Sequence, residues 1–169
     1  MITEGKEKME LLSGGEPSDY TKKRISFRTL YTGTRDFLME NFRGAVSFDE
    51  DITSSENLVI SPDGFAYFFK YVLNVVFGNT VLNVKMTSVR KDFTVTLDWK
   101  KHRSLTEGEE LALQRIALAS GFKLNLNETN ERITLTLYAE AKIYGYINIY
   151  APVFNNQIKT AFNRVFYLT

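Results

Sequence analysis

Four stretches of the chain alternate apolar and polar residues, and this pattern constrains the fold more than any other feature. Their apolar members are Leu82, Val84 and Met86; Phe93, Val95 and Leu97; Leu124 and Leu126; and Ile133, Leu135 and Leu137. Successive side chains of a β-strand point to opposite faces of its sheet, so each stretch is expected to form a strand with one apolar face. The pattern fits an antiparallel sheet with one face against a core and the other in water.

Two amphipathic helices are predicted to cover the apolar face of this sheet. Ser61 and Pro62 form an N-cap followed by proline at the first helical position. Thr106 and Glu109 form a capping box for a second helix, which stops at Gly121. The apolar residues of the helices recur at spacings of three and four: Phe65, Phe68, Phe69, Val72, Leu73 and Val76, then Leu111, Leu113, Ile116 and Ala117. The sequence therefore predicts an α+β fold, a two-layer α/β sandwich with a mostly antiparallel mixed sheet and helices on one face.

Shorter elements are predicted before the first of these helices. Residues 25–29 are expected to form a short strand, and Thr34 is expected to cap a helix that ends at Asn41. Residues 45–48 are predicted to form another strand. The acidic residues 49–51 after it are predicted to lie in a solvated loop.

The chain is predicted to contain one domain, at residues 25–142, with a segment on either side. Residues 1–24 are rich in charge and lack periodicity, which is typical of a flexible lead-in. Residues 143–169 are predicted to form a strand and a helix packed on the same domain. The strand carries the aromatic side chains Tyr144, Tyr146 and Tyr150, and the helix carries Phe154, Ile158, Ala161, Phe162 and Val165. The tyrosine face is interpreted either as a partner surface or as core.

The composition excludes several classes of site. Lys and Arg number 21 against 20 for Asp and Glu, so no overall field favours nucleic acid or an anionic membrane. The absence of cysteine excludes disulfides and thiolate chemistry. No apolar run is long enough to span a bilayer or to act as a signal peptide, so a cytoplasmic protein without a membrane partner is expected. His102 is the only histidine, and no paired carboxylates stand at catalytic spacing, so no catalytic residue is predicted.

A basic cluster follows the second strand of the predicted sheet. Lys100, Lys101, His102 and Arg103 stand next to Trp99, a composition that could bind nucleic acid through charge and stacking. In a chain of nearly neutral charge such a cluster is more typical of a solvated turn, so a nucleic-acid partner is not expected.

The order of the elements predicted between residues 25 and 137 resembles the ATP-binding domain shared by histidine kinases, gyrase-type ATPases and anti-sigma-factor kinases. The stretches that carry the resemblance are VSFDEDITSSENLVISPDGFAYFFKYVLNVVFGN, FTVTLDW and GEELALQRIALASGFKLNLNE. They resemble the approach to the N-box helix, the strand entering the first glycine box, and the helix after the second glycine box. The resemblance implies a Bergerat-type ATPase-like fold for residues 25–142. It also implies ATP and Mg²⁺ as ligands, with Asn74 holding the magnesium ion and Asp98 binding the adenine amino group.

The chain departs from this family's pattern where the nucleotide would bind. The residues after Asp98 are Trp99, Lys100, Lys101 and His102, so both glycines of the first glycine box are missing. Residues 107–110 supply three carboxylates in place of the second glycine box, and residues 98–106 are too few for the family's mobile lid. Glycines in such loops let backbone amides approach a phosphate, so their loss predicts a degenerate module without a nucleotide cofactor.

Two functions remain open at this point. The first is a non-catalytic, pseudokinase-type module of bacterial signal transduction, which acts through a signalling protein partner or as a homodimer. The alternative is a divergent but active ATP- and Mg²⁺-binding sensor histidine kinase or anti-sigma-type kinase. The alternative keeps Asn74 and Asp98 and uses Lys100 or Lys101 for the phosphate contacts that backbone amides make in the family.

Overall fold

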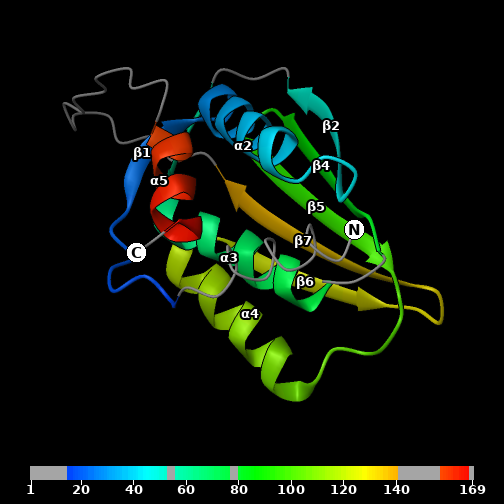
Figure 1. The fold of residues 1–169 in the computed structure, drawn as a ribbon. Coiled ribbons are helices and arrows are strands. Elements are labelled where there is room, and N and C mark those ends of the chain that lie inside the picture. Colours follow the sequence, from blue (N-terminus) through cyan, green and yellow to red (C-terminus); the bar gives the residue numbers. More distant parts are fainter. Residues whose placement is uncertain (1–14, 53–55, 77–79, 141–156, 168–169) are drawn as a thin grey trace.

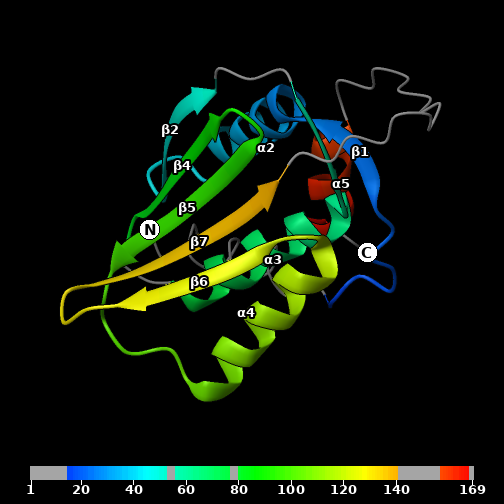
Figure 2. The ribbon, with the colours of Figure 1, turned by 180° about the vertical axis from the view of Figure 1, so that it is seen from behind.

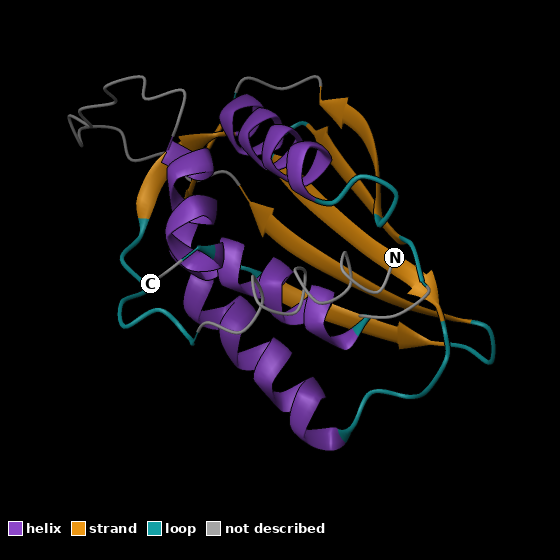
Figure 3. Ribbon diagram, in the orientation of Figure 1, coloured by secondary structure: helices purple, strands orange, loops and turns teal. Residues whose placement is uncertain are grey.

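The structure is a computed structural model that describes residues 15–52, 56–76, 80–140 and 157–167 of the chain. Figures 1 and 3 show its elements. In chain order they are β1 (Lys23–Ser26), α2 (Phe27–Asn41), β2 (Val46–Ile52), β3 (Asn57–Ile60), α3 (Pro62–Val75), β4 (Leu82–Val89), β5 (Asp92–Lys100), α4 (Glu107–Ser120), β6 (Lys123–Glu128), β7 (Arg132–Glu140) and α5 (Gln157–Phe166).

The main sheet has five strands in the order β2-β4-β5-β7-β6. Strand β2 runs parallel to β4, and the other neighbours are antiparallel. A separate two-stranded sheet joins β1 to β3. The helices cover one face of the main sheet, and the view from behind shows the strands of the opposite, open face (Figures 1 and 2). The predicted α+β sandwich with a mixed sheet is therefore confirmed.

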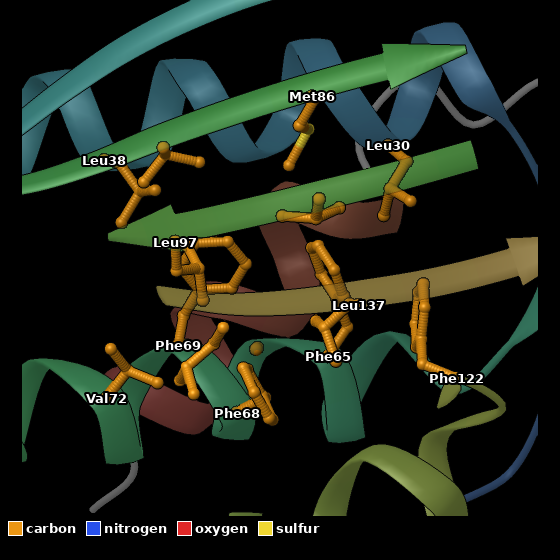
Figure 4. Close-up of a cluster of buried hydrophobic side chains, with 14 of the residues drawn as sticks. Leu30, Leu38, Phe65, Phe68, Phe69, Val72, Met86, Leu97, Phe122 and Leu137 are labelled. Atoms are coloured by element: carbon orange, nitrogen blue, oxygen red, sulfur yellow. The ribbon is translucent and has the colours of Figure 1, made fainter. Parts of the chain in front are cut away.

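The period-two pattern of the central strands matches their burial. In β5, Phe93, Val95, Leu97 and Trp99 are buried under the helices, while the residues between them are half-buried on the open face. The apolar members of β4 and β7 are buried in the same way. Figure 4 shows Phe65, Phe68, Phe69 and Val72 of α3 gathered with Leu97 and Leu137 of the sheet. Full burial of each such side chain stabilises the fold by about 1.5–3 kcal/mol, which is why this face holds the helices.

Both predicted helix starts are confirmed. The Ser61 Oγ accepts a hydrogen bond from the backbone N–H of Gly64 at 3.0 Å, and Pro62 follows as the first helical residue. Thr106 and Glu109 form the predicted capping box at the start of α4. Gly121 ends this helix with φ of 104°, a left-handed conformation that glycine adopts without strain.

Two local predictions are wrong. Thr34 does not cap a helix; it is buried inside α2, where its hydroxyl donates to the Leu30 carbonyl at 2.6 Å. The cap is Ser26, whose Oγ accepts from the Thr29 N–H at 3.0 Å, so the strand predicted at 25–29 is β1 and ends where α2 begins. The acidic residues 49–51 lie in β2 rather than in a loop, because their backbone pairs with β4 while their carboxylates stay exposed at the sheet edge.

Helix α5 is part of the core. Its residues Ile158, Ala161, Phe162 and Val165 are buried, as the helical spacing predicts. It approaches α2 so closely that a Cβ added at Gly33 would lie 2.8 Å from the Ile158 Cβ. The predicted strand at 143–150, with Tyr144, Tyr146 and Tyr150, and the residue Phe154 lie outside the described residues.

The described part of the predicted lead-in also contacts the domain. Lys23 and Arg24 belong to β1, and Glu16 forms an ion pair with Arg115 of α4. The domain boundaries at residues 24 and 142 stay predictions. No helix in the described ranges is long and apolar enough to cross a membrane.

Candidate functional site

Asp98 lies on the open face of the sheet. It shares the polar side of β5 with Thr94 and Thr96, and its carboxylate accepts a hydrogen bond from the Asn83 Nδ2 at 3.1 Å. The Arg132 guanidinium of β7 forms an ion pair with the same oxygen. The side chain is therefore engaged by its neighbours on the face away from the helices.

Asn74 lies on the other side of the sheet. It belongs to the last turn of α3, a helix that packs on the buried face, and it is exposed. The sheet therefore separates Asn74 from Asp98, and the structure does not bring the two together. The sequence contains a signal for this separation: Leu97 and Trp99 belong to the apolar side of β5, so alternation directs Asp98 to the polar side.

Lys100 and Lys101 have different surroundings. Lys100 is the last residue of β5 and is exposed. The Lys101 ammonium forms an ion pair with Glu128 at 3.1 Å and donates to the Thr129 carbonyl at 3.3 Å. Its backbone N–H donates to the Glu131 carbonyl at 2.8 Å. Lys101 is thus fastened to the hairpin between β6 and β7.

The connection between β5 and α4, residues 101–106, is held by the same hairpin. Glu128 accepts hydrogen bonds from the Ser104 hydroxyl at 2.9 Å and from the Leu105 N–H at 3.4 Å. These contacts, led by the one with Lys101, hold the pKa of Glu128 below its usual value. The Leu105 side chain is buried in the core and anchors the connection there.

A bidentate ion pair fastens the connection to the start of α4. The Arg103 guanidinium donates to both oxygens of Glu109, at 2.7 and 2.8 Å. Glu109 also accepts from the Thr106 N–H at 2.9 Å. The hydrogen bonds from Arg103 are the main cause that lowers the pKa of Glu109 to about 2. Of the basic cluster, Lys101 and Arg103 are therefore paired with carboxylates, and Trp99 is buried.

Lys70 is a buried cation that lies one turn before Asn74 on α3. Its ammonium donates to the Val165 carbonyl of α5 at 2.9 Å. Burial lowers the pKa of this side chain because water is excluded from the charged form. Val165 lies in the last turn of α5, where the helix leaves carbonyls without partners, so Lys70 joins α3 to the end of α5. Sequence reasoning missed this contact, although Lys70 falls four residues after Ala66 on the buried stripe.

Two surface hollows lie away from these residues. One, of about 300 Å³, is lined by Leu58, Val59, Ile60, Gly121, Lys123, Tyr138 and Ala139. The other, of about 340 Å³, is lined by Asp36, Met39, Glu40 and Arg43. Neither includes Asn74, Asp98, Lys100 or Lys101. Within the described ranges, no group of three or more acidic or histidine side chains is arranged to hold a metal ion.

Comparisons with known proteins identify the fold. No family model and no curated protein matches the sequence. Among solved structures, the histidine kinase AdeS of Acinetobacter baumannii is similar over 84% of this chain and 78% of its own, with a TM-score of 0.53 and 10% identity. The histidine kinase domain of the E. coli osmosensor EnvZ is similar over 76% of this chain and 94% of its own, with a TM-score of 0.53 and 8% identity.

A third similar structure is that of the histidine kinase ThkA in complex with the response regulator TrrA. The similarity extends over 83% of this chain and 47% of the matched chain, with a TM-score of 0.53 and 9% identity. The chain therefore has the fold of histidine kinase catalytic domains, at an identity too low to carry residue roles.

Proposed function

We propose that this chain is a signalling module with the architecture of a histidine kinase catalytic domain that does not bind ATP in that domain's manner. It acts in the cytoplasm by contact with a signalling protein and not as an enzyme. The structural similarity supports the choice of fold. The proposal that the module is non-catalytic rests on the residues around the β5–α4 connection.

The observation that carries the proposal is the way this connection is closed. A phosphate-binding loop works by presenting free backbone amides and positive charge to the ligand. Here the N–H of Glu109 is bonded to the Thr106 hydroxyl, and the N–H of Thr106 to the Glu109 carboxylate. Glu107 and Glu110 add two more carboxylates to the same turn of α4. A triphosphate would have to displace the caps and approach three negative charges.

The positions of Asn74 and Asp98 support the same proposal. By the resemblance, these residues would hold the metal ion and the adenine of one nucleotide, which requires both side chains to reach one pocket. In this chain they lie on opposite sides of the sheet, and Asp98 is paired with Arg132 and Asn83. Nucleotide binding depends on several positioned contacts acting together, so the loss of one side of the pocket removes most of the affinity.

A response regulator or a protein of similar role is the partner class that we propose. ThkA was crystallised with the response regulator TrrA, which shows that one protein of this fold forms such a complex. A module without a nucleotide site would be expected to bind its partner equally well with and without ATP.

Isothermal titration of the chain with ATP and Mg²⁺ tests the non-catalytic part of the proposal. We expect no saturable heat at millimolar nucleotide. The Asn74→Ala variant and a matched surface variant, Lys85→Ala, should both give the same result as the unchanged chain.

Micromolar binding that Asn74→Ala abolishes and Lys85→Ala leaves intact would contradict the proposal. That outcome would favour the divergent, active kinase, with Asn74 on the metal ion and Lys100 or Lys101 on the phosphates. Loss of the same binding in Asp98→Asn would extend the nucleotide site to the open face of the sheet.

A further inference from the structure

The hollow of about 300 Å³ is lined by both sheets of the fold. Strand β3 of the two-stranded sheet contributes Leu58, Val59 and Ile60, and the end of β7 in the main sheet contributes Tyr138 and Ala139. Ligand sites in proteins usually have volumes of about 300–1,000 Å³. The hollow is at the lower end of this range, so it suits a small ligand or a short stretch of polypeptide.

One edge of β3 is bonded to β1. The Phe27 N–H donates to the Glu56 carbonyl at 3.0 Å, which makes these two residues a hydrogen-bonded pair at the end of the β1–β3 ladder. Bonded and non-bonded pairs alternate along antiparallel strands, so Leu58 and Ile60 are also bonded to β1. Val59 lies between them, and its N–H and C=O groups therefore point away from β1.

The second edge of β3 is open at Val59. Two residues further on, the Ser61 N–H donates to the Ser120 carbonyl at 2.9 Å, so the odd-numbered residues face this second edge. The Val59 carbonyl oxygen would lie 3.1 Å from a Cβ added at Gly121, another residue that lines the hollow. Among the described residues, none forms a backbone hydrogen bond with Val59 on this side. The hollow thus contains an unpaired strand edge, which is a template for another strand.

The charged groups at this edge are cations. Lys123 is exposed and is the only charged residue among the described residues that line the hollow. Arg24 lies opposite Val59 in the β1–β3 ladder, in a non-bonded pair whose side chains lie close together. The Tyr138 hydroxyl is occupied, because it donates to the Asp92 carboxylate at 2.7 Å. The two cations favour a ligand that carries negative charge.

We propose that this hollow binds an extended, acidic peptide segment of a partner protein. The segment adds a third strand to the β1–β3 sheet by pairing its main chain with the N–H and C=O of Val59. A carboxylate side chain of the segment then contacts Lys123. In this mode of recognition the main-chain hydrogen bonds supply affinity and the side chains supply specificity.

The proposal does not depend on whether the chain binds a nucleotide. Neither the hollow nor the edge of β3 includes the β5–α4 connection, Asn74 or Asp98. Strand β3 has only four residues, so few main-chain hydrogen bonds form and the binding is weak. We expect a dissociation constant on the order of 100 µM.

Amide hydrogen exchange of the labelled chain tests the open edge before any peptide is added. The Leu58 and Ile60 amides are bonded to β1 and should exchange slowly, whereas the Val59 amide should exchange at least about tenfold faster. Equal protection of all three amides would show that the second edge is already paired, and it would overturn the proposal.

A fluorescein-labelled hexapeptide of alternating valine and glutamate is the probe for the site. Fluorescence anisotropy should show saturable binding to the full chain, and the peptide should slow exchange of the Val59 amide. Lys123→Glu should weaken binding by at least about fivefold, because it replaces attraction by repulsion. Lys85→Glu makes the same change of charge three strands away on β4 and should leave the affinity unchanged.

The same peptide with N-methyl groups on every backbone nitrogen separates strand pairing from attraction between charges. It keeps the carboxylates but has no main-chain donors, so it should not bind. Equal binding of the two peptides would overturn the proposal. So would the absence of saturable binding at about 2 mM peptide, well above the expected dissociation constant, or equal weakening by Lys123→Glu and Lys85→Glu.

Discussion

Replacing Gly33 with alanine tests whether α5 is packed as tightly on α2 as the structure indicates. Alanine normally stabilises a helix interior by about 0.8–1 kcal/mol over glycine. At Gly33, however, the new Cβ would lie 2.8 Å from the Ile158 Cβ and 3.3 Å from the backbone nitrogen of Lys159. Neither atom is the end of a flexible side chain, so α5 must move away from α2.

The cost of that movement exceeds the gain in helix propensity. Forcing extra atoms into a packed contact costs typically about 1–3 kcal/mol. We therefore expect Gly33→Ala to lower the free energy of unfolding by up to about 2 kcal/mol, the difference between these two effects. Movement of α5 would also loosen the tilted ring contacts of Phe162 with Phe37 and Phe69, whose ring centres lie 5.1 and 5.7 Å from that of Phe162.

Urea unfolding followed by circular dichroism measures this change. Gly108→Ala is the matched control, because the same substitution in the first turn of α4 would meet only the Thr106 hydroxyl, at 4.0 Å. That control should be neutral or stabilising by up to about 1 kcal/mol. If Gly33→Ala stabilises the chain as much as Gly108→Ala does, α5 is not in close contact with α2 and the reasoning fails.

Three further outcomes are expected. Because the pKa of Glu109 is about 2 against 4.5 unfolded, its ion pair adds stability above pH 4.5 that is lost as pH falls toward 2. Arg103 is half-exposed, so Arg103→Gln should cost only about 1 kcal/mol in urea unfolding at pH 6 and much less at pH 2, where Glu109 is already partly protonated. Burial lowers the pKa of Lys70, so as pH rises toward 10.5 the folded chain loses the Lys70 proton before the unfolded chain does. The free energy of unfolding of the unchanged chain should therefore rise over this range relative to that of Lys70→Met. A difference between the two that does not change with pH would show that Lys70 is not desolvated. In Phe162→Ala, which removes the central ring between α2, α3 and α5, the free energy of unfolding should fall by about 3–5 kcal/mol, and a loss below 1 kcal/mol would place α5 outside the core.

Local signals made the central part of the fold predictable. Alternation in β4, β5 and β7 assigns each residue to a face, and the caps at Ser61 and Thr106 fix the starts of α3 and α4. Each signal lies within a few residues of the element that it defines. No longer-range information is needed to recognise these elements.

The wrong predictions have non-local causes. Residues 49–51 form a strand only because β4, more than thirty residues later, supplies hydrogen-bonding partners. Thr34 and Ser26 are both good cap residues by type, and the β1–β3 pairing decides between them by holding the chain extended up to Ser26. The Lys70 contact depends on α5, whose place against α3 is invisible in the pattern around Lys70.

The candidate site was only partly predictable. The missing glycines and the short β5–α4 connection are readable in the sequence, whereas the contacts of Glu128 with Lys101, Ser104 and Leu105 depend on how the β6–β7 hairpin lies beside that connection. The separation of Asp98 from Asn74 follows from alternation in β5. A family alignment by motif alone does not reveal it.

We propose that this histidine kinase fold has no nucleotide site of the family's type. The most direct measurement is a titration of the isotopically labelled chain with ATP and Mg²⁺, followed through its backbone amide chemical shifts. We expect no saturable shifts in α3 near Asn74 or in residues 101–110. Saturable shifts that cluster at both places, at micromolar nucleotide, would contradict it.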